Sequence, residues 1–185
     1  MKYQVNLVDA NGRACVRHLG FNDVCVDAAE VERLLQHPEN LANESALVRL
    51  ARGGNVLVRQ ALFSRMEEDA VLGIVLGLAG DGDADAMEAV IRHADNPKCW
   101  EMLRFFAQRH SERAVDFVLG NVHREGGLLC AIELAEQQCP KARDYIRDLA
   151  GLIRLADKGA PFTKESLQAY KDYSPDCRER ILRLG

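Results

Sequence analysis

Residues 46–62 read ALVRLARGGNVLVRQAL, and residues 74–90 repeat this pattern 28 positions later as IVLGLAGDGDADAMEAV. Four copies follow one another along the chain. They are clearest where a bulky apolar residue precedes alanine, at Leu50-Ala51, Leu78-Ala79, Phe106-Ala107 and Leu134-Ala135. Self-similarity at a fixed period is typical of proteins that stack one small structural unit on copies of itself. The period therefore decides the fold class.

Each copy has the pattern of two helices joined by a short loop. Five residues after the bulky apolar position stand Asn55, Asp83, Ser111 and Cys139, and Pro140 follows the last. Asparagine, aspartate and serine cap helices by accepting a hydrogen bond from a backbone N–H of the first turn. Proline is favoured at the first helical position. The spacing predicts that the second helices begin near residues 56, 84, 112 and 140.

Apolar side chains recur with helical spacing inside each copy. In the second helix of the first copy, Val58, Ala61 and Leu62 form the i, i+3, i+4 stripe of an amphipathic helix. Two helices of this length cannot bury their apolar faces alone, so neighbouring copies must stack. We expect a mainly α protein, a right-handed α-α superhelix (solenoid) of four two-helix repeats of about 28 residues over 39–150.

The N-terminal region departs from the period. Residues 2–18 predict a β-hairpin, because the Asn11-Gly12 pair within them is a strong hairpin-turn signal. Asp27 then has capping-box spacing to Glu30, which predicts a helix to about residue 36. We expect residues 1–38 to cap the repeats with a hairpin and a helix.

The C-terminal region also leaves the register. Two helices are expected after residue 150, one from Thr163 and one from Ser174-Pro175, a cap followed by a first-turn proline. They form a predicted C-terminal cap over 151–185. The whole chain, 1–185, is expected to be a single α-solenoid domain.

Two motifs resemble known helical repeats. The pattern Asn55-x-x-Val58-Arg59-x-Ala61-Leu62 resembles the second helix of HEAT-like repeats. The run 92–97, Arg-His-Ala-Asp-Asn-Pro, is similar to leucine-rich repeat variant proteins, which are also two-helix solenoids. The resemblance covers the four repeats and implies an interaction scaffold. It carries over no catalytic residues.

Composition argues against several partners. The net charge of −4 and the isoelectric point near 5.8 give no electrostatic reason to expect nucleic acid or an anionic membrane. The longest apolar stretch, Ala70 to Ala79, is interrupted by Gly73 and Gly77 and is too short to span a bilayer. The N-terminus lacks an apolar signal segment, so the six cysteines are expected to be reduced thiols in a cytoplasmic protein.

No motif for chemistry is present. No two histidines lie three to five residues apart, and no nucleotide-binding or nucleophile-elbow sequence occurs. Cys99, His123 and Cys130 could approach one another across copies, but Cys130 occupies a core column. We therefore expect no catalytic residues, no metal and no cofactor.

The candidate partner-binding residues lie on the second helices. At one repeated position the residues of all four copies are polar and form a ridge. At the neighbouring repeated positions the residues are apolar in the two middle copies, and arginines stand in the first and last copies. The candidates are Arg59, Gln60, Phe63, Met87, Glu88, Ile91, Arg92, Asp116, Leu119, Arg143, Asp144 and Arg147. These columns either pack successive copies together or line a groove with an apolar floor.

The function expected from the sequence is a cytosolic protein–protein interaction module, an adaptor or scaffold, that binds a protein partner through the surface of the second helices. One alternative is an enzyme whose site is assembled from dispersed residues in the groove. A less favoured alternative is a HEAT-like protein that binds nucleic acid, because the acidic balance supplies no counterion release.

Overall fold

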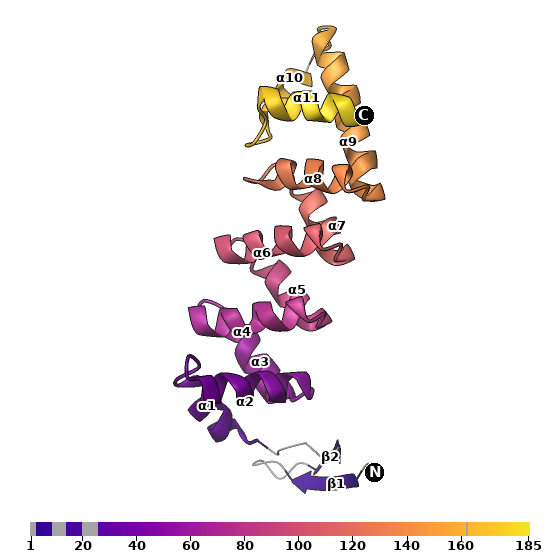
Figure 1. Ribbon diagram of the computed structural model, residues 1–185. Coiled ribbons are helices and arrows are strands. Elements are labelled where there is room, and N and C mark those ends of the chain that lie inside the picture. The colour runs from indigo at the N-terminus through magenta and orange to yellow at the C-terminus, as the bar shows by residue number, and fades with distance from the viewer. Residues whose placement is uncertain (1–2, 9–13, 20–25, 162) are drawn as a thin grey trace. The chain divides into compact units, whose positions relative to one another are not determined.

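The computed structural model describes residues 3–8, 14–19, 26–161 and 163–185. These residues are mainly helical, with eleven helices among them. The chain divides into two compact units, Met1–Asp81 and Gly82–Gly185, and Figure 1 labels the elements of each. The boundary falls between the two helices of the second repeat.

The first unit begins with two paired strands. β1 (Tyr3–Val8) and β2 (Ala14–Leu19) are antiparallel, with Tyr3 opposite Leu19 and Val8 opposite Ala14. The predicted turn at Asn11-Gly12 lies outside the described residues. Nothing in the described part of the chain supports the prediction that this hairpin caps the helices, because each strand has the other as its main contact.

Four helices complete the first unit. They are α1 (Ala28–Leu35), α2 (Leu41–Arg52), α3 (Val56–Ser64) and α4 (Asp69–Gly80). α1 packs on α3 and α2 packs on α4, so the unit has two helical layers joined by short loops. The Asp27 carboxylate accepts a hydrogen bond from the Glu30 backbone N–H at 2.8 Å, which confirms the predicted cap of α1.

The second unit also has two layers of helices and contains the C-terminal helices. Its elements are α5 (Ala84–Arg92), α6 (Pro97–Gln108), α7 (Glu112–Gly120), α8 (Gly127–Glu136), α9 (Pro140–Asp157), α10 (Thr163–Gln168) and α11 (Pro175–Leu184). Within this unit α5, α7 and α9 form one layer, and α6, α8 and α11 form the other. The predicted helices from Thr163 and from Ser174-Pro175 are confirmed.

The second helices begin where the cap pattern predicts. α3, α5, α7 and α9 start at residues 56, 84, 112 and 140, directly after Asn55, Asp83, Ser111 and Cys139. Asn55 accepts from the Val58 N–H, and Asp83 accepts from two backbone N–H groups of its first turn. Ser111 makes no such bond, so the cap column marks each helix start without always supplying the side-chain contact.

The core follows the 28-residue columns. One column of the first helices and one of the second helices are fully buried in every copy, at Leu47, Val75, Leu103 and Ala131, and at Leu62, Val90, Val118 and Ile146. The alanine column from Ala51 to Ala135 is at most 2% exposed. Its small side chains let the two helices of each copy approach closely. None of the helices in the described residues has the length and apolar character needed to cross a bilayer.

Candidate functional site

The predicted binding residues on the second helices are not uniformly at the surface. Gln60, Glu88, Asp116 and Asp144 are exposed, as a polar ridge requires. Met87 is 6% exposed, however, and Val115 at the equivalent position of the next copy is 4% exposed. The side chains of Met87 and Val115 therefore pack between helices, and little of their surface is left to form the floor of a groove.

The remaining predicted residues divide between half-buried and exposed. Phe63, Ile91 and Leu119 are half-buried, whereas Arg92 is exposed. Each of these residues is placed within its own unit, so no continuous surface across the two units follows from them.

Several charges of this ridge have partners within the protein. Arg59 donates to the Ala51 carbonyl at 3.2 Å and lies over the Phe63 ring. Arg147 pairs with Asp144 at 2.9 Å, and Arg143 donates to Gln138 at 2.6 Å. The arginines at the ends of the predicted groove therefore have contacts that a protein partner would have to replace.

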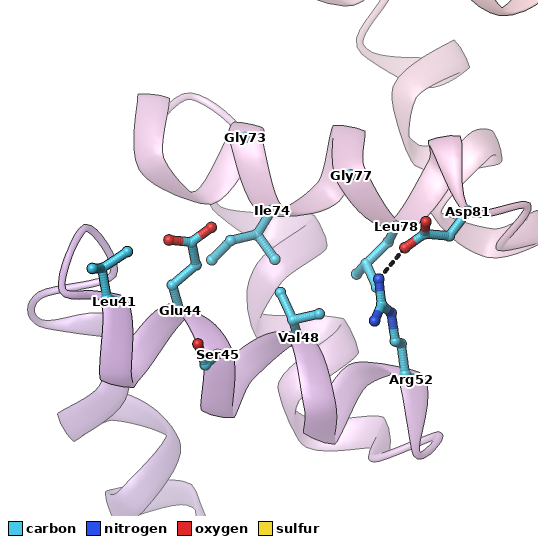
Figure 2. Close-up of a pocket in the computed structure, with 10 residues that line it drawn as sticks. All are labelled: Leu41, Glu44, Ser45, Val48, Arg52, Gly73, Ile74, Gly77, Leu78 and Asp81. Atoms are coloured by element: carbon cyan, nitrogen blue, oxygen red, sulfur yellow. Dashed lines mark hydrogen bonds and ion pairs between the residues drawn. The ribbon is translucent and has the colours of Figure 1, made fainter.

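A hollow that the sequence reasoning missed lies in the first unit, on the opposite layer of helices. It has a volume of about 480 Å³ and runs between α2 and α4 (Figure 2). From α2 it is lined by Leu41, Glu44, Ser45, Val48 and Arg52. From α4 and its C-cap it is lined by Gly73, Ile74, Gly77, Leu78 and Asp81. We call this the α2/α4 hollow.

Two glycines open the α2/α4 hollow. Gly73 and Gly77 are exposed in the interior of α4, and a Cβ atom added at either would meet no other atom within 4 Å. Close helix packing therefore does not require glycine at either position. Glycine inside a helix costs about 0.5–1 kcal/mol relative to alanine. The effect of having glycine at these two positions is that the space beside α4 stays empty.

The same helix positions carry side chains in the second unit. One step of 28 from Gly73 and Gly77 leads to Glu101 and Phe105 on α6, and a second step leads to Leu129 and Glu133 on α8. Glu133 accepts a hydrogen bond from Gln108 of α6 at 2.6 Å, so its side chain links the two first helices there. The glycine pair that lines the hollow between α2 and α4 is thus not repeated on α6 or α8.

Apolar and charged groups alternate along the α2/α4 hollow. Ile74 and Leu78 are 3% and 1% exposed and form its floor, while Leu41 at one end is 79% exposed. Leu41 therefore presents a large apolar side chain to solvent beside a floor that is itself almost closed to water. At the other end Arg52 forms an ion pair with Asp81, and both side chains are more than half exposed.

The Glu44 carboxylate lies within the hollow without a partner. Its side chain is half-buried and extends from α2 toward α4 near Ile74 (Figure 2). No hydrogen bond or ion pair joins this carboxylate to any side chain in the described residues. A half-buried carboxylate beside apolar groups favours a cationic or hydrogen-bond-donating ligand.

The histidines and cysteines from residue 26 onward form no metal site among the side chains that the structure describes. Cys99 and Cys130 are buried, whereas His123 is exposed. In residues 26–161 and 163–185 no three His, Cys, Asp or Glu side chains are arranged to hold a metal ion. Burial raises the pKa of Cys130 to about 11, so its thiol stays protonated at neutral pH.

The sequence held one signal for the α2/α4 hollow. Gly73 and Gly77 interrupt an apolar run at a spacing of four, which places both on one helix face. Their importance emerges only once α2 lies beside them.

Compared with protein-family models, with curated proteins and with solved structures, the chain matches none.

Proposed function

We propose that this protein is a HEAT-like α-solenoid that acts as a protein–protein interaction module and docks a partner in the α2/α4 hollow. The repeat fold is supported by helix starts and buried columns that recur at the 28-residue period. Helical repeats use extended helix surfaces to bind other proteins. A cytoplasmic location is supported by Cys99, Cys130, Cys139 and Cys177, which are free thiols.

One observation carries the proposal. Gly73 and Gly77 stand in the interior of a helix where space is open and where alanine would make a more stable helix. Natural proteins commonly give up stability at binding sites. Beside these glycines, Leu41 exposes most of its side chain to water. A binding surface accounts for both features.

The second helices remain a second candidate surface on the same protein. Gln60 and Asp116 are exposed there, but Asp116 already pairs with Lys141 at 2.6 Å. Surface ion pairs contribute about 0–1 kcal/mol, so a partner could displace this one at little cost. Within the first unit, Gln60 on α3 and the α2/α4 hollow lie on different helix layers, so the two surfaces can be tested separately.

Site-specific photo-crosslinking in the source cells tests the proposal. A benzophenone amino acid is placed at Ser45 in the hollow, at Gln60 or Asp116 on the second helices, or at exposed Lys164 on α10 as a control. We expect a discrete protein adduct from position 45, abolished by Gly77→Leu and retained with Gly151→Ala, a helical glycine outside the hollow.

Each outcome of this experiment decides something. Adducts from positions 60 and 116 alone would keep the interaction module and move its surface to the second helices. Adducts from position 45 that persist after Gly77→Leu would show that the hollow is not the docking site. Absence of adducts from all three positions would overturn the proposal.

A further inference from the structure

The α2/α4 hollow has dimensions that suit a helix. Its lining on α2 extends from Leu41 to Arg52, which at the helical rise corresponds to about 16 Å, or three turns. Both walls are helices whose backbone groups are already bonded within the helix, so they offer no free edge to an extended strand. A partner must therefore bind through side chains, as an amphipathic helix does in a groove.

The glycines on the α4 wall also favour a helix as the binding partner. Where a wall has no Cβ, the partner's backbone can approach more closely than ordinary side chains allow. Gly73 and Gly77 are one helical turn apart, so they leave a strip along α4. Small or branched apolar side chains of a partner helix can lie along this strip, opposite the half-buried Val48 of α2.

The charged residues at the hollow indicate which kind of partner helix would bind there. Glu44 is the unpaired charge in the lining, because Arg52 and Asp81 neutralise each other at the opposite end. Glu67-Glu68-Asp69 begins α4 at the same end as Glu44, since residues 40 and 68 are the N-caps of the two neighbouring helices. Glu68 pairs with Arg65 at 4.0 Å and Asp69 has a contact of its own, so the negative charge at the Leu41 end of the hollow comes from Glu44 with Glu67 nearby in the chain segment before α4.

We infer that the α2/α4 hollow binds an amphipathic helix of a partner protein that places a lysine or arginine against Glu44. This inference rests on the proposed function and specifies the chemistry of the partner. The apolar face of that helix covers Leu41 and Val48 and lies along Gly73 and Gly77, and its basic residue pairs with Glu44. Complementary charge fixes the direction in which the helix lies and raises the association rate.

Three synthetic peptides test the inference with the full chain. Each is a fluorescein-labelled amphipathic helix of about 18 residues, or five turns, with the same leucine and alanine face. They differ only in the flanking residues, which are lysine, glutamine or glutamate. Binding is measured by fluorescence anisotropy. We expect the lysine peptide to bind about tenfold more tightly than the glutamine peptide, and the glutamate peptide most weakly.

Variants assign this order to the hollow. Glu44→Lys should reverse the preference between the lysine and glutamate peptides, whereas Glu101→Lys, at an exposed site on α6, should leave the order unchanged. Gly77→Leu should weaken all three peptides by filling the floor. Its side chain enters open space, so the variant should fold, and circular dichroism checks this. Gly77→Ala, with a smaller side chain, is a second variant that should weaken binding less.

The outcomes separate the inference from the proposed function. Equal binding of all three peptides, lost in Gly77→Leu but unchanged in Glu44→Lys, would overturn the basic partner and keep docking in the hollow. No binding of any peptide would overturn the inference, and the adduct expected from position 45 then tests the proposed function separately. Self-association of the wild-type chain that Gly77→Leu abolishes, without peptide binding, would identify a second copy as the occupant and also overturn the inference.

Discussion

The guanidinium of Arg124 lies over the ring of Trp100, with 4.6 Å between its Cζ atom and the ring centroid. The same guanidinium donates to the Ala94 carbonyl at 2.6 Å, and the Trp100 indole N–H donates to the Glu125 carbonyl at 2.7 Å. These contacts tie the loop before α8 to the first turn of α6. They hold the fourth repeat at the point where α8 starts with Gly127 after a left-handed Gly126.

The Trp100–Arg124 contact predicts energetic coupling. Trp100→Phe removes the indole hydrogen bond and weakens the cation–π contact, and Arg124→Met removes the charge. Each change should cost about 1–2 kcal/mol of unfolding free energy, and the double variant should cost about 0.5–1 kcal/mol less than the sum. Urea unfolding followed by far-UV circular dichroism measures this. Strict additivity would show that the ring contact contributes nothing.

The capping residues of the second helices predict unequal losses of stability when they are replaced by alanine. Asn55→Ala removes the side-chain oxygen that accepts from the Val58 N–H at 3.1 Å, so it should destabilise by about 1 kcal/mol. Ser111→Ala at the matched position should cost less, because the Ser111 side chain makes no cap bond. Thermal unfolding of the two variants provides the comparison. Equal losses would mean that the cap column acts through backbone preference alone.

The sequence predicted the second helices accurately because their determinants are local. Each start needs a cap residue or a proline, and each buried face needs an apolar stripe, as at Val58 and Leu62. The start of α8 at Gly127 follows instead from Gly126, whose φ of 73° is left-handed and which lies against the Arg104 side chain. That contact joins residues distant in sequence, and periodicity carries no information about it.

The candidate site was harder to predict. Met87 and Val115 have the pattern of an apolar groove floor, but helix packing buries them. Gly73 and Gly77 read as breaks in an apolar run, although their missing side chains make the hollow. A sequence pattern records the side chains that are present. Whether a missing side chain leaves space depends on the neighbouring helix.

An ion pair between α8 and α11 predicts a loss of stability in acid. Glu136 accepts from Arg180 at 2.8 Å and 3.1 Å, and these hydrogen bonds hold the pKa of the Glu136 carboxyl below its usual value of 4.5. A carboxyl with a lowered pKa stabilises the fold above its unfolded pKa, and this contribution is lost as the pH falls through the folded pKa. Both side chains are partly exposed, so the contribution is about 1 kcal/mol or less.

Comparison of wild type with Glu136→Gln isolates this pair. At neutral pH the variant should be less stable in urea, and at about pH 3 the difference should shrink as the wild-type carboxyl is protonated. Glu101→Gln serves as the exposed control and should show no such pH-dependent difference. A difference that stays constant with pH would show that Glu136 acts through packing.

The glycines of α4 predict that stability and binding change in opposite directions. Gly73→Ala and Gly77→Ala should each raise the unfolding free energy by about 0.5–1 kcal/mol, because alanine favours the helix and the added Cβ meets no neighbouring atom within 4 Å. Gly151→Ala on α9 should stabilise to a similar degree for the same reason. Gly126→Ala should destabilise, because a left-handed φ is strained for alanine and Arg104 occupies the space. Urea unfolding ranks the four variants.

Binding of the lysine-flanked peptide should weaken in the two α4 variants, because the added side chains occupy the hollow, and it should stay unchanged in Gly151→Ala. If Gly73→Ala and Gly77→Ala proved destabilising, a structural need for glycine would explain both residues. The two glycines would then no longer indicate a binding site.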